Sequence, residues 1–238
     1  MSTTLNQLLD ALASPTSSVR EDALESLGKY VQAGCKSEDV KLIQRRSLEF
    51  LRHPEIQARS FAVLALEILV RFVHLNDQKM NQQVMTWYKD ETDLRGYSTE
   101  KGWLHAVAHG ADYFATCLNN DAIDSLTVVE TLFARIISSE QGWTYMEDAR
   151  VARTLSLALQ KDAKVFNSFI SKSEIILEYL GSGENYGAQH NFRSVMLSLY
   201  PALLSAGTFS KQEIEPLTMF YQDMTPYLFE KFNQNKES

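Results

Sequence analysis

The residues best suited to chemistry lie in the stretch from Gly102 to Asp112, which reads Gly-Trp-Leu-His-Ala-Val-Ala-His-Gly-Ala-Asp. On a helix predicted over residues 103–118, His105, His109 and Asp112 fall within an arc of about 60°, because successive residues turn by about 100°. Two histidines four residues apart are a spacing used in helical zinc sites, and Asp112 could add an oxygen ligand or orient His109. The pattern predicts a divalent metal site at these three residues.

The same pattern has two other interpretations. Histidines on a polar helix stripe can be satisfied by hydrogen bonds to neighbouring side chains or backbone, without any ligand. Alternatively, the stripe lines a groove that binds a small molecule or a peptide. A zinc protease is not predicted, because Ala106 follows His105 where the His-Glu-x-x-His motif needs a glutamate. The sequence also contains no P-loop, nucleophile elbow or dinucleotide fingerprint.

The charge-dense segment 90–101 is predicted to be a loop that forms a wall or lid of this site. Arg95 offers bidentate recognition of a carboxylate or phosphate, and Gly96 allows a tight bend before Tyr97. The structural alternative is a solvated loop in which Ser98 caps the following helix.

Glu147 and Arg150 also fit more than one role. A capping box with Thr144 explains Glu147 without any ligand, because the hydroxyl and the carboxylate satisfy each other's backbone donors. Arg150 is expected to pair with Asp112 or Glu147, and such a pair would be structural. In the metal interpretation, Glu147 or Asp148 would instead activate water.

Helix start and stop signals recur along the whole chain, whereas strand-like alternation never extends beyond a few residues. Ten glycines and five prolines in 238 residues also favour helices over turn-rich β structure. The predicted fold class is therefore all-α. Helix starts are expected at capping boxes that begin at Ser18, Thr144 and Ser210, and helix ends at Gly34, Gly181 and Gly207. Pro54 is expected directly before a long apolar helix over 55–74, and another helix is expected to end before Pro201.

A weak internal repeat relates these helices. The segments that open the long apolar helices begin at Arg20, Arg59, His105, Arg150 and Arg193, with spacings of 39, 46, 45 and 43 residues. These spacings lie near the HEAT and armadillo periods, and Gly-Trp doublets at 102 and 142 add a second point of register. The predicted architecture is a right-handed α-α superhelix of antiparallel helix pairs, forming a single domain over residues 1–238.

The predicted inner helices each carry one polar stripe on a mostly apolar surface. The stripes contain Ser60, Glu67, Arg71 and His74; then His105, His109, Asp112 and Thr116; then Glu147, Arg150 and Thr154; and finally Asn191, Ser194 and Ser198. Because inner helices line the concave side of a superhelix, these stripes are expected to share one polar groove.

Composition limits the classes of function. A net charge of −7 makes nucleic-acid binding unlikely, because phosphate affinity comes mainly from clustered Lys and Arg. The first residues contain no secretory or transit signal, and the longest apolar stretch falls short of the roughly 20 residues of a membrane span. A cytoplasmic location without membrane partners is therefore expected. Cys35 and Cys117 fit ordinary reduced thiols.

The stretch Asp93-Leu-Arg-Gly-Tyr-Ser-Thr-Glu-Lys-Gly-Trp-Leu-His-Ala-Val-Ala-His-Gly-Ala-Asp112 resembles the signature of an uncharacterised bacterial family, the domain of unknown function 2785. Residues 146–155 and 191–200 resemble later blocks of that family more loosely. The resemblance implies a cytoplasmic helical protein with hallmark positions Gly102, Trp103, His105, His109 and Asp112. It implies no established activity.

The leading functional hypothesis is a binding module whose polar groove receives a protein segment or a small-molecule ligand. The expected groove residues are Arg95, Tyr97, Trp103, His105, His109, Asp112, Glu147 and Arg150. Whether the protein is an enzyme is left open. One alternative is a metal-dependent hydrolase with its ion on His105, His109 and Asp112. A second, disfavoured by the acidic balance, is a helical-repeat enzyme acting on nucleic acid.

Overall fold

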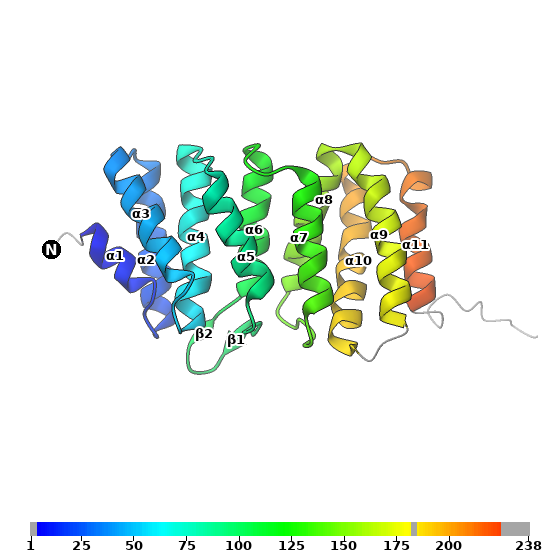
Figure 1. The fold of residues 1–238 in the computed structure, drawn as a ribbon, viewed down its shortest axis with the longest axis horizontal. Coiled ribbons are helices and arrows are strands. Elements are labelled where there is room, and N and C mark those ends of the chain that lie inside the picture. The colour runs from blue at the N-terminus through cyan, green and yellow to red at the C-terminus, as the bar shows by residue number, and fades with distance from the viewer. Residues whose placement is uncertain (1–3, 182–184, 225–238) are drawn as a thin grey trace, which may run out of the picture.

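A computed structural model describes residues 4–181 and 185–224, and these residues form helices with one short hairpin (Figure 1). The prediction of an all-α protein is confirmed. The helices are α1 (Leu5–Ala11), α2 (Ser17–Gln32), α3 (Ser37–Phe50), α4 (Ile56–Val73), α5 (Gln78–Asp90), α6 (Ala106–Asn119), α7 (Ser125–Ser138), α8 (Glu147–Lys161), α9 (Ala163–Gly181), α10 (Tyr186–Ala206) and α11 (Lys211–Met224). The hairpin pairs β1 (Tyr97–Ser98) with β2 (Gly102–Trp103), antiparallel, between α5 and α6.

The helices lie in two layers. Helices α2, α4, α6, α8 and α10 pack side by side in sequence order and form what we call the even layer. Helices α3, α5, α7, α9 and α11 form the odd layer in front of it in Figure 1. The helices of the two layers bury most of their hydrophobic side chains against one another.

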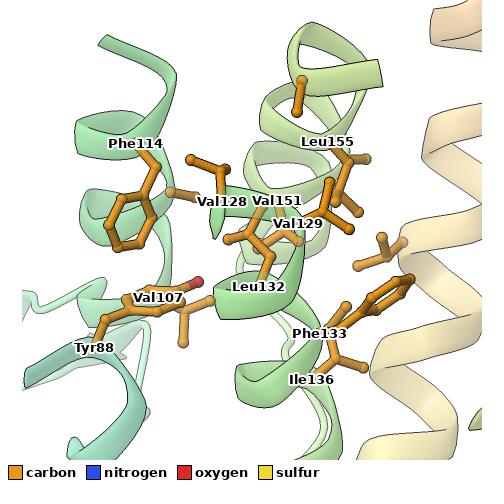
Figure 2. Packing of buried hydrophobic residues seen from close by; sticks show 14 of the residues in the cluster. Tyr88, Val107, Phe114, Val128, Val129, Leu132, Phe133, Ile136, Val151 and Leu155 are labelled. Carbon is orange, nitrogen blue, oxygen red and sulfur yellow. The ribbon is translucent and has the colours of Figure 1, made fainter. Parts of the chain in front are cut away.

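The core lies between the two layers. Figure 2 shows Tyr88 of α5 and Phe114 of α6 packed with Val128 and Leu132 of α7, and all four side chains are buried. Gly110 allows this close packing, because a Cβ atom at that position would collide with the Tyr88 ring. The fit depends on the absence of a side chain from one turn of α6.

Helix α4 joins two clusters of buried apolar side chains. Phe61, Ala65 and Leu69 belong to a cluster with α1, α2 and α3. Leu66 and Val70 belong to the larger cluster that continues to Phe220 in α11. A helix that is apolar around most of its circumference is expected where both sides are buried, and the sequence of α4 has this character.

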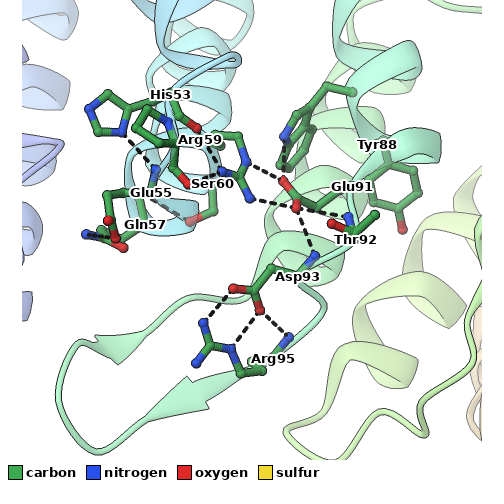
Figure 3. A network of polar contacts seen from close by, with 12 residues as sticks. His53, Glu55, Gln57, Arg59, Ser60, Tyr88, Glu91, Thr92, Asp93 and Arg95 are labelled. Carbon is green, nitrogen blue, oxygen red and sulfur yellow. Dashed lines mark hydrogen bonds and ion pairs between the residues drawn. The ribbon is translucent and has the colours of Figure 1, made fainter.

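Two arginines in equivalent positions support the repeat in its N-terminal part. In α2, the Nη1 atom of Arg20 donates to the carbonyl oxygens of Ser14 (2.7 Å) and Pro15 (3.0 Å). In α4, the Nη1 atom of Arg59 donates to the carbonyl oxygens of the residues six and five positions upstream, His53 (2.7 Å) and Pro54 (2.8 Å), as Figure 3 shows for this second pair. The 39-residue spacing therefore corresponds to one repeated structural motif.

Several predicted helix boundaries were wrong. The helix predicted over 103–118 begins at Ala106, because β2 occupies Gly102–Trp103 and His105 adopts a left-handed conformation with φ of 44°. Ser18 lies inside α2 rather than before it, and Pro54 lies two residues before α4. Pro201 lies inside α10, which continues to Ala206.

Three predicted boundary signals were correct. Ser210 and Glu213 form the expected capping box, since each side chain bonds the other residue's backbone N–H. Gly207 ends α10 in the left-handed conformation that favours glycine, with φ of 67°. Gly34, directly after the cap of α2, also has a positive φ, of 95°.

Among the helices of residues 4–181 and 185–224, none combines the length and the apolar character needed to cross a bilayer.

Replacing Arg20 tests its structural role. Arg20→Met would leave carbonyl oxygens of two loops without donors, so we expect the free energy of unfolding to fall by about 2–4 kcal/mol. Arg45→Met is the matched control, because Arg45 is exposed and pairs only with Glu49 on its own helix. It should change stability by about 0.5 kcal/mol or less. Urea titration measures both, and equal effects would contradict the assigned role.

Candidate functional site

The hairpin between α5 and α6 is anchored at its start by the carboxylate of Glu91. Arg59 binds this buried carboxylate with two atoms, Nε (2.6 Å) and Nη2 (2.8 Å), in the arrangement drawn in Figure 3. Trp87 Nε1 (3.0 Å) and the backbone N–H groups of Thr92 and Asp93 donate to it as well. Glu91 therefore fixes the direction in which the chain leaves α5.

Two further arginines hold the hairpin backbone. Arg135, on α7, donates from Nη1 to the carbonyl oxygen of Glu91 (2.6 Å). Arg20, on α2, donates from Nη2 to the carbonyl oxygens of Lys101 (2.5 Å) and Trp103 (3.1 Å). The hairpin is thus fixed at both ends by groups from distant parts of the sequence.

His105 is held between an aromatic ring and a carboxylate. Its imidazole stacks on the indole of Trp103, with ring centroids 4.6 Å apart and an interplanar angle of 9°. Its Nδ1 atom lies 3.2 Å from Oε1 of Glu147, the first residue of α8. Within the described part of the chain, Nε2 of His105 has no hydrogen-bond partner. The carboxylate therefore orients the imidazole and leaves its second nitrogen available.

Glu147 is buried and charged. Burial raises its pKa, but hydrogen bonds from His105, from its own backbone N–H and from the N–H of Tyr145 outweigh burial, so the pKa of Glu147 is lowered. The capping box predicted between Thr144 and Glu147 is wrong. Helix α8 begins at Glu147 itself, after Met146 in a left-handed conformation, and Glu147 Oε2 accepts from Tyr145 N–H (2.8 Å).

Gly96 lets the hairpin approach this carboxylate. The backbone passes so close to α8 that a Cβ atom at Gly96 would collide with Oε1 of Glu147 and with the Tyr145 side chain. The Gly96 carbonyl accepts hydrogen bonds from the N–H groups of Leu104 (2.9 Å) and His105 (3.2 Å). The bend expected at Gly96 therefore exists, and its close contact with α8 explains why no side chain fits.

His109 lies one helical turn beyond His105 but in a different environment. It packs edge-on against Phe61 with ring centroids 5.5 Å apart, and its Nδ1 atom is inaccessible and has no hydrogen-bond partner. Burial, with a smaller effect of His105, lowers the pKa of His109 to about 3, although the backbone of Ser60 acts in the opposite direction. His109 is therefore a partly buried, neutral residue whose ring packs against Phe61 and whose Nδ1 atom is enclosed.

Asp112 is occupied by arginines. Two arginines of α8 contact its carboxylate. Arg150 contacts Oδ2 of Asp112, and Arg153 lies 3.4 Å from Oδ1. The predicted Arg150–Asp112 pair is confirmed. Arg153 was not predicted, although its position three residues after Arg150 places it on the same face of α8.

The polar stripe of α6 continues toward α4. Thr116 donates to Oε1 of the buried Glu67 (2.8 Å), and Arg71 pairs with the same oxygen. At the end of α4, His74 Nδ1 lies 2.6 Å from the side-chain oxygen of Asn120. Glu67 and Thr116 thus connect α4 to α6, whereas His105 and Asp112 contact α8.

Three exposed aromatic side chains surround the His105 position. Ring centroids of Tyr97 and Trp103 are 5.0 Å apart, those of Trp103 and Tyr145 5.9 Å, and those of Tyr97 and Tyr145 6.0 Å. The rings contact one another, so they form a cluster rather than an open cage. All three are exposed, which makes Trp103 unlike the buried Trp143. Tyr145 was missed in the sequence because adjacency to Tyr97 depends on the hairpin.

We call the region made of Tyr97, Trp103, His105, Asp112, Tyr145, Arg150 and Arg153 the α6–α8 surface.

Arg95 was also predicted to contact a ligand. In the structure its guanidinium is paired with the neighbouring Asp93 through Nε (2.8 Å) and Nη2 (2.5 Å). Ser98 does not cap a helix; it lies in β1, and its hydroxyl accepts from the N–H groups of Glu100 and Lys101 in the hairpin turn.

The structure does not assemble His105, His109 and Asp112 into a metal-binding group. His105 faces Glu147, His109 is packed on Phe61, and Asp112 is bound to two arginines. Across residues 4–181 and 185–224, no group of three or more His, Cys, Asp or Glu side chains is placed to hold a metal ion.

A cavity of about 580 Å³ lies elsewhere, between α3 and α5. Its lining includes Leu51, Arg52, Arg59, Trp87 and Asp90, and none of the α6–α8 surface residues. The predicted site and this cavity are therefore separate features.

The fold and this surface define an all-helical protein of paired helices with an ordered hairpin beside a histidine–carboxylate pair. The chain belongs to the family described as protein of unknown function (DUF2785), whose model matches residues 48–200. The resemblance of residues 93–112 lies inside the matched region. Neither the curated proteins nor the solved structures contain a match to the chain.

Substitution of Gly96 tests the close contact between the hairpin and α8. Gly96→Ala should displace Glu147 and lower the free energy of unfolding by about 1–3 kcal/mol, because the added methyl group has no room. The control is Gly28→Ala in α2, where the new Cβ atom would lie 3.7 Å from Ile68, an ordinary contact. That variant should gain about 0.5–1 kcal/mol from helix propensity. Thermal or urea unfolding distinguishes the two signs.

The pKa of His109 predicts a pH dependence of stability. The unfolded chain binds a proton near pH 6.5 and the folded protein only near pH 3, so stability is complete above pH 6.5 and falls as the pH is lowered. This one group should cost about 2 kcal/mol between pH 7 and pH 5. His109→Met should remove that part of the loss in urea titrations at the two pH values. An unchanged pH dependence in the variant would contradict the burial of His109.

Proposed function

We propose that this protein is a cytoplasmic binding module and that the α6–α8 surface receives a protein segment or small-molecule ligand. The observation that carries the proposal is the orientation of His105. A buried carboxylate fixes Nδ1, an indole supports the ring, and Nε2 is left without a protein partner within the described residues. An imidazole held in this way can donate or accept one hydrogen bond in a defined direction.

Backbone strain beside this pair supports the proposal. His105 and Met146 both adopt left-handed conformations, with φ of 44° and 66°, and each directly precedes a helix that contributes to the surface. Such conformations cost about 1–3 kcal/mol for residues other than glycine and cluster at functional sites. Two of them at the ends of neighbouring helices indicate that their geometry serves more than folding.

We further propose that the helices form a single HEAT-like domain, a right-handed α-α superhelix. The repeated arginine motif at Arg20 and Arg59 supports this arrangement, and so does the order of helices within the even layer. Repeat proteins of this kind use extended surfaces of neighbouring helices to bind partners.

The binding function is favoured over a metal-dependent hydrolase because the candidate ligands already have other partners. Asp112 would have to leave two arginines, and His109 would have to leave its packed position on Phe61. The net charge of −7 disfavours the third candidate, an enzyme acting on nucleic acid.

Affinity capture with a matched pair of variants tests the proposal. Wild-type protein and Trp103→Ala/Tyr145→Ala are immobilised and exposed to an extract of the source cells, and each enriched molecule is then purified or synthesised. Its Kd is measured by calorimetry. We expect the double variant to bind at least tenfold more weakly, because it removes exposed aromatic area at the surface. Tyr30→Ala, which removes an exposed aromatic ring on α2, is the control.

The proposal is contradicted if every purified partner binds the Trp103→Ala/Tyr145→Ala variant as tightly as wild type while the circular dichroism and unfolding midpoint of the variant remain normal.

A further inference from the structure

The ion pairs of the α6–α8 surface and its neighbourhood have an unequal exposure of their two charges. The side chain of Asp112 is 13% exposed, whereas those of Arg150 and Arg153 are 53% and 57% exposed. In the adjoining pair, Glu67 is 8% exposed and Arg71 is 57% exposed. The carboxylates therefore lie in the floor, and the guanidinium groups lie above them at the solvent.

Two ion pairs on α2 and α3 lack this asymmetry. Lys29 and Glu25 on α2 are 73% and 65% exposed, and Arg45 and Glu49 on α3 are 60% and 52% exposed. A partner approaching those helices meets both signs of charge equally. A partner approaching the α6–α8 surface meets mainly guanidinium groups.

The arginines at Asp112 also keep donors free for a ligand. Each guanidinium carries five N–H donors, and Arg150 and Arg153 each use one nitrogen, Nη1, on Asp112. At Asp112, two positive charges share one negative charge. Because the Debye length is about 8 Å at physiological ionic strength, a ligand bound there interacts mainly with these nearby charges and only weakly with distant parts of the overall charge of −7.

From these observations we propose that the α6–α8 surface binds an acidic protein segment that also carries an aromatic or large apolar residue. Carboxylates of the segment pair with Arg150 and Arg153, and the apolar residue packs on the cluster of Tyr97, Trp103 and Tyr145. Arginine suits this role because its planar group binds carboxylates with two parallel hydrogen bonds. This inference rests on the proposed binding function and names the chemistry of the partner.

The test uses synthetic peptides as probes. A fluorescein-labelled degenerate 12-residue peptide pool has Asp or Glu at alternate positions and Phe, Tyr or Leu between them. A second pool replaces Asp and Glu by Asn and Gln, and a single-stranded 12-mer oligonucleotide provides the other polyanion. Fluorescence anisotropy is measured with wild-type protein at 50 and 300 mM NaCl. We expect the acidic pool to bind at least tenfold more tightly than the uncharged pool, more tightly than the oligonucleotide, and more weakly at high salt.

Variants separate the proposed charge effect from a general loss of structure. Arg150→Gln/Arg153→Gln should weaken binding of the acidic pool at least tenfold. Asp112→Asn should instead tighten it about threefold, because both guanidinium groups lose their internal carboxylate. A merely structural pair would give weaker binding in both cases. Lys29→Gln/Arg45→Gln removes two exposed cations on α2 and α3 and should leave binding unchanged.

The inference is overturned by equal binding of the charged and uncharged pools, by weaker binding to Asp112→Asn, or by tighter binding of the oligonucleotide. If the uncharged pool binds and Trp103→Ala/Tyr145→Ala abolishes that binding, the proposed function stands and only the acidic partner is wrong. If neither pool binds wild-type protein at 1 mM, the inference fails. The capture experiment then decides the proposed function on its own.

Discussion

Two buried arginines, Arg20 and Arg135, and the partly buried Arg59 fix the hairpin on which the rest of the site depends. Arg20, Arg59 and Arg135 come from α2, α4 and α7, and each donates to backbone or side-chain oxygens of other segments. Burying a guanidinium costs several kcal/mol unless its donors are satisfied. Only Arg59 has a carboxylate partner, Glu91, so the other two depend on neutral acceptors, and burial lowers the pKa of both. The hydrogen bonds of their Nη atoms offset part of this cost, and a misplaced hairpin would lose them.

The fixed hairpin determines the chemistry available at α8. Because Gly96 lies against Glu147, the carboxylate is held in the interior, where it accepts hydrogen bonds from His105 and from the backbone. The same hairpin places Trp103 under the imidazole. The candidate site is thus produced by contacts between segments that are distant in the sequence. Its exposed indole, Trp103, and its buried carboxylate, Glu147, both contact His105. A loss of packing at Gly96 would change the direction of the His105 ring before it changed the fold.

The different exposure of the acidic and basic side chains in these ion pairs also follows from the cost of burying a charge. A carboxylate can have low exposure when hydrogen-bond donors contact it, as at Asp112 and Glu67. Arginine has a long apolar stem, so its charged end reaches water while the stem covers the helix surface. An interhelical ion pair built from a short acid and a long base therefore presents positive charge outward. In this protein that arrangement gives an acidic chain a locally basic surface.

The sequence by itself determined the helical class and the family, because helical periodicity and a family signature are carried by local residue patterns. It also predicted that Arg150 pairs with Asp112 or Glu147, and the structure selects Asp112. Only the tertiary structure decided which histidine keeps a ring nitrogen available for a ligand. His105 and His109 look equivalent at positions i and i+4, yet the left-handed backbone at His105 and the packing of His109 on Phe61 give them opposite environments. Those environments depend on the hairpin and on residues more than 40 positions away, and helical spacing carries no information about either.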